Sequence, residues 1–358
     1  MKKAAAIGLL FLVTATGCGT TSPKKNERKD IHPARISNLV LQKIIRFNVV
    51  RVSQTTCFME GLSLYCSKYA TNIDFTRLNS KTAKLESGND AVKVSVNDTK
   101  FLPVTRQLIH FLSRHTDSTA TGNFPSPDHL LAHCFAESLD TWSYLVYYSN
   151  DTFYKYRGTV GEADENITNQ HCTIEMKANG ILHVTLPYIQ YDEITGLMEK
   201  QKQNVNNAKA VILDLRDSTG GLMGDCVETA GIFLHPKDIA GYIEAERGAR
   251  ALHPKNNPVF EDIPVVVLVN GKTSSGSELI AAALKEQRDA IIIGSRTHGL
   301  GWIQSIIGIT EKIYLALASH YIYTPSMQKL HGRGVEPDIH AGNNAAMLKK
   351  ALSVLKRR

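Results

Sequence analysis

From residue 180 onward, short apolar runs alternate with segments whose apolar residues recur at helical spacing. The apolar runs predict strands at 181–186, 209–215, 264–269, 289–294, 302–308 and 312–323. The helical spacing predicts helices at 192–204, 222–234 and 277–286, and an amphipathic helix at 343–356. Runs rich in Val, Ile and Leu between helices are typical of a sheet covered on its faces, so we expect an α/β domain here.

The pattern before residue 180 is less regular. Apolar spacing predicts helices within 36–69, at 108–112 and at 130–139, so we expect the region 37–157 to be mainly helical. Gly122, Pro125 and Pro127 predict a loop at 116–127. The segment 71–98 is polar and has no clear period, so it permits no assignment.

The first residues have the pattern of an export signal. Lys2 and Lys3 precede an apolar run that is too short to span a bilayer. Residues 15–18 (Ala-Thr-Gly-Cys) resemble the lipobox of bacterial lipoproteins, with Ala15 in place of the usual leucine. We therefore expect a signal peptide at 1–17, lipidation at Cys18 and a polar tether at 18–36, or, alternatively, cleavage by ordinary signal peptidase. Lipidation implies a membrane-anchored protein of a bacterial cell envelope that faces the periplasm or another space outside the cytoplasm.

The composition is that of a globular protein. Among 358 residues, 43% are hydrophobic and 21% are charged, which suits one large or two ordinary domains. The formal net charge is +7, and part of it lies in basic residues near both ends of the sequence. No nucleic-acid-binding motif accompanies this charge, so we expect no nucleic-acid partner.

Five cysteines lie beyond Cys18, an odd number that in an exported protein predicts two disulfides and one free thiol. Cys57 and Cys66 are the nearest local pair. Cys226 lies on an apolar helix face and is expected to be a buried thiol. No His and Cys residues have the spacing of metal ligands, so we expect neither a metal nor another cofactor.

Three segments carry candidate chemistry. Residues 264–277 (PVVVLVNGKTSSGS) lead from a strand through a turn to a helix, and Ser275 lies at that turn. Such a serine has an exposed hydroxyl beside helix N-terminal amides, which suits a nucleophile, although a serine that only caps the helix is the alternative. Residues 210–225 (AVILDLRDSTGGLMGD) form a second strand followed by Gly220 and Gly221, which permit close backbone approach. The third segment is 312–339.

These three blocks, in this order and spacing, resemble the C-terminal processing (tail-specific) serine peptidase family over roughly 180–340. The resemblance implies a core like that of crotonase and Clp protease, built from β-β-α units over 180–342. It also implies that Ser275 is the nucleophile and that the amides of Gly276 and of Gly220 and Gly221 are the oxyanion donors. Gln304 would orient the general base.

The resemblance is incomplete before the core. Residues 139–144 match part of the family motif LDPHSxY, with Thr141 and Trp142 in place of its proline and histidine. The family then carries a PDZ domain, but here only residues 153–179, fewer than thirty, remain for it before the next strand. That length cannot form a PDZ fold, so we expect a short connector at 158–179.

The general base of the family is also missing. In the segment 297–304 (THGLGWIQ) the position of the family lysine holds Leu300, which cannot accept a proton. His298 is the first candidate replacement, because in extended backbone it shares a face with residue 300; it is alternatively a loop histidine that faces solvent or stacks on Trp302. The other candidates are Lys272, which is expected to point to solvent, and three histidines of the preceding region, His129, His133 and His171.

Two functions follow from this combination. The first is a serine endopeptidase-like lipoprotein that acts on polypeptide C-termini in the cell envelope. The second is a catalytically degenerate pseudopeptidase that binds such tails as an adaptor. A crotonase-type acyl-CoA enzyme is a third reading, against which the export signal argues. Asp214 and Arg216 are interpreted as structural, with Asp214 at a strand end and Arg216 paired with a carboxylate.

Overall fold

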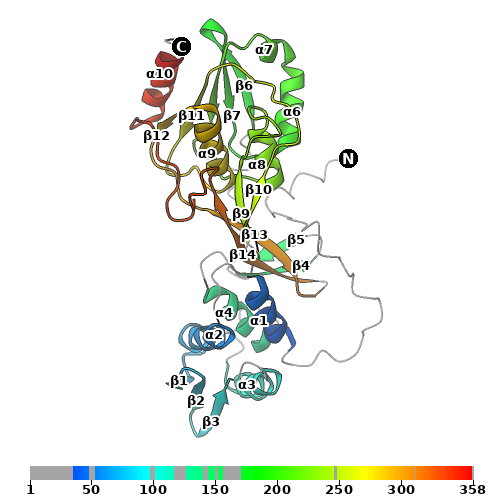
Figure 1. Cartoon of the computed structure of the whole chain (residues 1–358). Coiled ribbons are helices and arrows are strands. Elements are labelled where there is room, and N and C mark those ends of the chain that lie inside the picture. The colour runs from blue at the N-terminus through cyan, green and yellow to red at the C-terminus, as the bar shows by residue number, and fades with distance from the viewer. Residues whose placement is uncertain are drawn as a thin grey trace, which may run out of the picture. The chain divides into compact units, whose positions relative to one another are not determined.

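The computed structural model describes residues 35–47, 53–96, 101–116, 126–139, 144–149, 152–155, 171–245, 248–310 and 312–356. The chain divides into two compact units, which are considered separately (Figure 1). The core unit includes 163–303 and 320–358, and the N-terminal unit includes 14–162 and 304–319.

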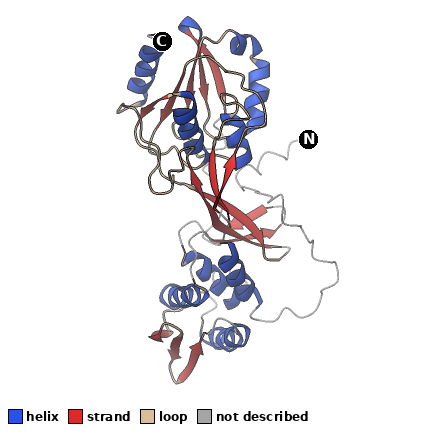
Figure 2. Cartoon of the chain, in the orientation of Figure 1, coloured by secondary structure: helices blue, strands red, loops and turns tan. Residues whose placement is uncertain are grey.

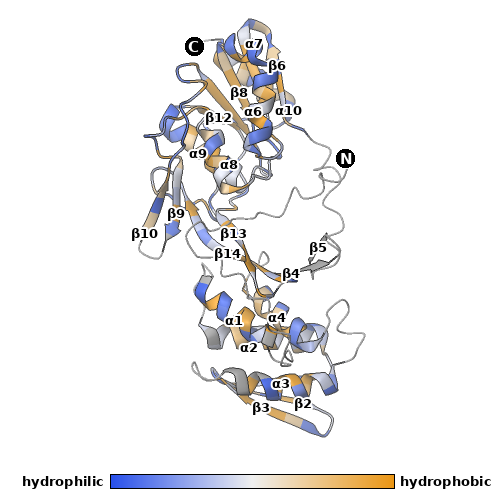
Figure 3. Cartoon of the chain, turned by 90° about the vertical axis from the view of Figure 1, so that its right-hand side faces the viewer, coloured by the Kyte–Doolittle hydropathy of each residue, from blue (hydrophilic) through white to orange (hydrophobic). Residues whose placement is uncertain are grey.

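A six-stranded sheet forms the centre of the core unit (Figure 2). Its strand order is β15-β12-β11-β8-β7-β6, in which β6 is antiparallel to β7 and all other neighbours are parallel. Every residue of β8 and β11 is buried, as expected of a parallel sheet with both faces covered, and β8 is coloured hydrophobic in Figure 3. The strands are β6 (Thr173–Lys177), β7 (Ile181–Thr185), β8 (Ala210–Asp214), β11 (Val265–Val269), β12 (Ile291–Gly294) and β15 (Ile339–His340).

Helices pack on both faces of this sheet. One face contributes Leu213 and Val267 to a core shared with α6 (Tyr191–Lys200), α8 (Met223–Ala230) and α9 (Gly276–Arg288). The other face contributes Ile212 and Leu268 to a core shared with Met347 of α10 (Asn344–Leu355). The expected α/β core is therefore confirmed.

The single helix expected at 192–204 is interrupted. α6 ends at Lys200 and a short helix, α7 (Lys202–Asn206), follows Gln201, whose backbone is not helical. The Gln201 side chain donates from Nε2 to the Ile174 carbonyl on β6 at 2.9 Å. This tertiary hydrogen bond fixes the break, and nothing in the apolar spacing indicates it.

An antiparallel hairpin in the core unit has no counterpart in the sequence-based expectation. It consists of β9 (Gly241–Ala245) and β10 (Gly248–Leu252), and β9 also pairs with Ile322 and Tyr323 at the end of β14. No residue of β10 is fully buried. β10 therefore lacks the alternation of buried apolar and exposed polar residues that identifies a strand from sequence, whereas β9 buries Ile243 in the core of the unit.

The N-terminal unit is mainly helical, as expected. Its helices are α1 (Arg35–Phe47), α2 (Gln54–Tyr69), α3 (Phe101–His115) and α4 (Pro127–Glu137), and they share one apolar core. Strand β4 (Tyr144–Ser149) pairs with β5 (Thr152–Lys155) and with the first residues of β14 (Ile313–Tyr323), which also pairs with β13 (Trp302–Gly308).

The unassigned segment 71–98 forms a three-stranded antiparallel sheet. Its strands are β1 (Asp74–Asn79), β2 (Thr82–Ser87) and β3 (Asp90–Ser95). Only β2 buries an alternating pair of apolar side chains, Ala83 and Leu85, whereas β1 is almost entirely exposed. β1 carries no buried apolar period, whereas Val92, Val94 and Val96 alternate with polar residues in and just after β3, which is a period-two strand signal.

The expected disulfides are not formed. Cys57, Cys66, Cys134, Cys172 and Cys226 are all free and buried. Cys57 and Cys66 both lie on α2, nine positions apart, which separates them by about 13 Å along the helix axis, far beyond disulfide reach. The expectation of a buried thiol at Cys226 is confirmed.

Several expectations fall outside the described residues. These are the signal peptide, Cys18 and its tether, the motif residues Asp140, Trp142 and Ser143, and most of the connector 158–179. Within the ranges given above, no helix has the length and apolar character needed to cross a bilayer.

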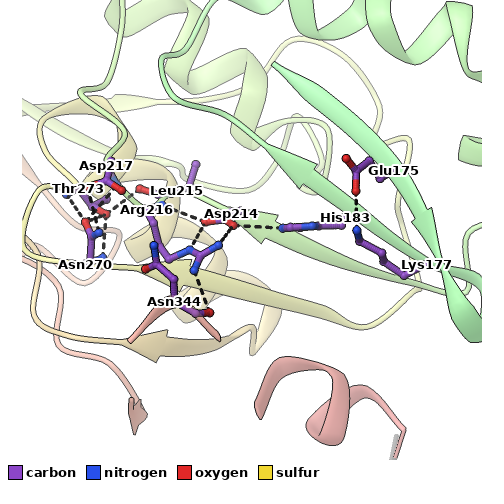
Figure 4. A network of polar contacts seen from close by, with 10 residues as sticks. All are labelled: Glu175, Lys177, His183, Asp214, Leu215, Arg216, Asp217, Asn270, Thr273 and Asn344. Atoms are coloured by element: carbon purple, nitrogen blue, oxygen red, sulfur yellow. Dashed lines mark hydrogen bonds and ion pairs between the residues drawn. The ribbon is translucent and has the colours of Figure 1, made fainter. Parts of the chain in front are cut away.

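Asp214, the last residue of β8, organises a buried polar network in the core unit (Figure 4). Arg216 donates to both Asp214 carboxylate oxygens, and His183 Nε2 lies 3.1 Å from Oδ2. Arg216 also donates from Nη1 to the Asn344 carbonyl at the start of α10, at 3.1 Å. Burial alone would raise the pKa of the Asp214 carboxyl, but the hydrogen bonds from His183 and Arg216 hold it below its ordinary value. Asp214 and Arg216 thus have the structural places expected of them.

Replacing Asp214 tests this network through the pH dependence of stability. Because the folded-state pKa is lowered, the carboxylate stabilises the fold above its ordinary pKa of about 4, and this contribution is lost as pH falls through the folded value. We expect Asp214→Asn to reduce the unfolding free energy by roughly 3 kcal/mol at pH 7, and the difference from wild type to shrink in acid. Urea denaturation at pH 7 and pH 3 measures it. Glu199→Gln, at an exposed ion pair with Lys202, is the control and should change little. A difference that stays constant with pH would contradict this role.

Candidate active site

The candidate site lies where β8 and β11 end. Because these neighbouring strands are parallel, the loops that follow them leave the sheet at the same edge. Thr273 Oγ1 donates to the Leu215 carbonyl at 2.7 Å, and the Ser274 amide donates to the Ser218 carbonyl at 2.9 Å. These contacts join the two loops that the sequence singled out.

Ser275 lies in a strained turn immediately before α9. Its φ is +57° and its ψ is −127°, a conformation that costs a non-glycine residue about 1–3 kcal/mol. The residues on either side, Ser274 and Gly276, are buried, whereas Ser275 is partly exposed. A strained strand-to-helix turn that exposes a serine is the arrangement used by serine nucleophiles.

Gly220 and Gly276 bring the two loops into close contact. Gly220 has a φ of +84°, and a Cβ on it would lie 2.8 Å from the Gly276 nitrogen and 3.1 Å from the Ser275 Cβ. A Cβ on Gly276 would lie 2.1 Å from the Cys226 Sγ and 3.6 Å from the Gly221 nitrogen. The amides of Gly221 and Gly276 therefore lie near the serine turn, as two oxyanion donors require, although their catalytic role stays a prediction.

Glu278, in the first turn of α9, is fully buried and accepts four hydrogen bonds. Its Oε2 accepts from the Ser275 amide at 2.9 Å and the Leu300 amide at 2.8 Å. Its Oε1 accepts from Thr297 Oγ1 at 2.5 Å and the Gly299 amide at 2.7 Å. Burial raises the pKa of this carboxyl, and the hydrogen bonds partly offset that effect. One carboxylate thus joins the serine turn to the loop 297–300.

The loop 297–300 contains Leu300, the residue that the sequence resemblance places at the lysine position; this assignment stays a prediction. The Leu300 amide shares its acceptor atom with the Ser275 amide, so residue 300 lies beside the serine turn. His298 is exposed, and its amide donates to the Thr273 carbonyl at 2.9 Å. The proposed role of His298 as a base stays a prediction.

The surroundings of the other base candidates differ, and their roles stay predictions. The Lys272 side chain is 81% exposed and lies 3.6 Å from Asp217, so it points to solvent as expected. His171 is largely exposed and lies 4.0 Å from Glu193. His129 and His133 belong to the N-terminal unit, where the His129 ring contacts Ser126 Oγ at 2.8 Å and His133 is buried beside Glu137. Gln304 is assigned to the N-terminal unit as well, so its orienting role stays a prediction.

Two residues of the site carry roles that sequence reasoning missed. Glu278 lies three positions after Ser275, and an acidic residue at that spacing after a helix-capping serine is the signature of a capping box. Cys226 was interpreted as a buried thiol, and its contact with Gly276 has no sequence signal because it depends on how α8 meets α9.

Comparisons with known proteins agree with this geometry. Residues 180–341 match the model of peptidase family S41. A carboxy-terminal-processing protease of Bartonella bacilliformis is 34% identical over 145 residues, which are 39% of this chain and 32% of that protein. Carboxyl-terminal-processing peptidase 1 of Arabidopsis thaliana, a chloroplastic protein, is 30% identical over 163 residues, 43% of this chain and 33% of that protein. The matched part thus spans about a third of the length of these relatives.

A solved structure resembles a larger part of the chain. The structure of a lipoprotein from Streptococcus agalactiae has a TM-score of 0.56, with 92% of this chain and 98% of that chain covered at 16% identity. At that identity the likeness concerns the fold alone. The parallel strands of the sheet, the serine turn and the glycine loop all lie within the residues that match this peptidase family model. Residues 180–341 belong to peptidase family S41.

The contact between Gly276 and Cys226 gives a stability test. We expect Gly276→Ala to destabilise the protein by about 1–3 kcal/mol, because its methyl group would overlap the Cys226 sulfur. Adding Cys226→Ala should recover part of that loss by removing the sulfur. Gly224→Ala is the control, since nothing lies within 4 Å of the added Cβ and alanine favours helix, so stability should rise slightly. Thermal unfolding is measured for the wild type, Gly276→Ala, Cys226→Ala, the double variant and the control Gly224→Ala. Independent, additive effects of Gly276→Ala and Cys226→Ala would exclude the contact.

Proposed function

We propose that this protein is a serine-type peptidase of the C-terminal processing kind that acts on polypeptide C-termini. The observation that carries the proposal is the partly exposed Ser275, held in a strained turn against Gly220 with the Gly221 and Gly276 amides close by. Its substrate would bind as an extended strand beside Ser275. In this mechanism Ser275 Oγ attacks the scissile carbonyl, and the two amides stabilise the oxyanion.

The rate of this reaction depends on a general base that accepts the Ser275 proton. A serine hydroxyl without a base is a poor nucleophile, and loss of one member of such a unit can cost up to about a millionfold in turnover. Leu300 occupies the lysine position, and its amide is fixed beside the serine turn. His298 is the proposed substitute, and the imidazole would need to come within about 3 Å of Ser275 Oγ when substrate binds.

The second candidate function is an adaptor that binds polypeptide tails without cutting them. The observation that favours it concerns the loop 297–300. Glu278 holds the backbone of this loop in place, while the side chain at position 300 is an alkyl group. Such a site would retain the geometry for binding a carbonyl and lack the proton acceptor that activates Ser275.

We also propose that the protein is anchored in a bacterial cell envelope through a lipid on Cys18. Two features of the first residues support this proposal: a short apolar run and the Ala-Thr-Gly-Cys segment that follows it. Its polypeptide substrates would then be exported proteins.

Cleavage of an unfolded protein with an apolar C-terminus tests the proposal. We expect slow cleavage by the wild type that Ser275→Ala abolishes, and at least tenfold faster cleavage by Leu300→Lys, because a lysine there supplies the missing base. Product formation is followed by mass spectrometry, with the double variant Leu300→Lys, Ser275→Ala as the control for contaminating peptidases. Binding by both wild type and Ser275→Ala, with no cleavage by any variant, would support the adaptor instead.

His298→Ala tests the substitute base. If His298 accepts the Ser275 proton, this variant should lose at least a hundredfold in kcat/KM. The same substitution in the Leu300→Lys background should have little effect, since lysine then serves as base. Undiminished turnover of His298→Ala would exclude this role.

A further inference from the structure

We propose that Glu278 is a positioning residue that sets where the general base meets Ser275. It does so by joining the serine turn and the loop 297–300 through one buried carboxylate. The inference deepens the proposed function and rests on it for the catalytic readout, whereas its structural part can be tested without any activity.

The first step is the saturation of the carboxylate. Each Glu278 oxygen accepts two hydrogen bonds, one set from Ser275 and Leu300 and the other from Thr297 and Gly299. Four donors around a fully buried carboxylate leave no free lone pair directed at the Ser275 hydroxyl. Glu278 is therefore not the base itself, and its effect on chemistry must act through the groups it holds.

The second step is that one oxygen links nucleophile and base position. Oε2 accepts from the Ser275 amide at 2.9 Å and from the Leu300 amide at 2.8 Å, so these two backbones cannot move apart without breaking a charge-assisted hydrogen bond. The Ser275 turn is strained, and this bond compensates for part of the strain. The backbone of residue 300, from which its side chain extends, is consequently fixed relative to Ser275.

The third step is that the rest of the loop leaves little room for adjustment. Thr297 exchanges hydrogen bonds with Val335, through its amide at 3.1 Å and its Oγ1 at 2.7 Å. The Gly299 carbonyl accepts from the Gly332 amide at 2.9 Å, and Gly299 has a φ of +83°. A Cβ on Gly301 would lie 2.1 Å from the His331 nitrogen. With its outer side fixed in this way, the loop is attached to the segment before α9 by the Glu278 carboxylate and by one backbone hydrogen bond, from the His298 amide to the Thr273 carbonyl at 2.9 Å.

Glu278→Gln is the test, because glutamine keeps the shape but presents an NH2 group to two donors. Glu286→Gln is the matched control: Glu286 lies on the same helix and accepts from the Ser326 amide at 2.7 Å, away from the serine turn. Hydrogen exchange of the full chain is measured by NMR. We expect the Gly299 and Leu300 amides to exchange at least tenfold faster in Glu278→Gln, and the amides of Val267 and Ile292 in the sheet to be unchanged.

Kinetics in the Leu300→Lys background provide the second readout. There Glu278→Gln should lower kcat at least tenfold with KM within about twofold, and a fluorophosphonate probe should label Ser275 more slowly by a similar factor. Glu286→Gln should change neither. A purely structural role would instead raise exchange throughout the sheet and leave kcat per folded molecule intact, and that result would overturn the proposal.

The two readouts separate this inference from the proposed function. If Leu300→Lys shows neither cleavage nor labelling, but Glu278→Gln selectively loosens Gly299 and Leu300, the peptidase proposal fails and the positioning role stands. If exchange at Gly299 and Leu300 does not change in Glu278→Gln, the positioning role is wrong whatever the activity.

Discussion

The parallel pairing of β8 with β11 is the constraint on which the candidate site depends. Two neighbouring parallel strands deliver their following loops to the same edge of the sheet, so Gly220 and Ser275 meet although they are far apart in the sequence. The strands are buried throughout, which fixes their register against slippage. The strained serine conformation can persist because its surroundings are rigid. Because Gly220 has no side chain, the backbone of its loop can come into contact with the backbone around Ser275 and Gly276.

Much of the core unit could be predicted from apolar periodicity. The strands around residues 181, 210, 265 and 291 and the helix after Ser275 follow the expected pattern, because both faces of this sheet are buried and its sequence is correspondingly apolar. Strands β1 and β10 could not be predicted, since no residue in either strand is fully buried and neither carries an apolar period. The break at Gln201 and the free cysteines depend on tertiary contacts or helix geometry that spacing alone does not reveal.

The candidate site was predictable to a similar extent. Motif spacing identified Ser275, Gly276, Gly220 and Gly221, and the structure brings these four together. The absence of lysine at Leu300 is visible in the sequence itself. The sequence does not show which groups contact one another. The four hydrogen bonds to Glu278 and the contact between the Cys226 sulfur and Gly276 depend on how separate segments pack together. The identity of the general base also could not be predicted, because it depends on which side chain packs near Ser275.

The helix α10 has a consequence for anyone who shortens or extends this chain. Met347, Ala351 and Leu355 lie over Ile212, Leu268 and Ile293 on the sheet face opposite α8 and α9, and the start of α10 is tied to Arg216. Arg216 precedes Gly220 by only four positions. Truncation near residue 343 would leave that aliphatic surface open to water and promote self-association. It would also release the strand end from which the glycine loop departs, so recombinant versions should keep residues 344–355 intact.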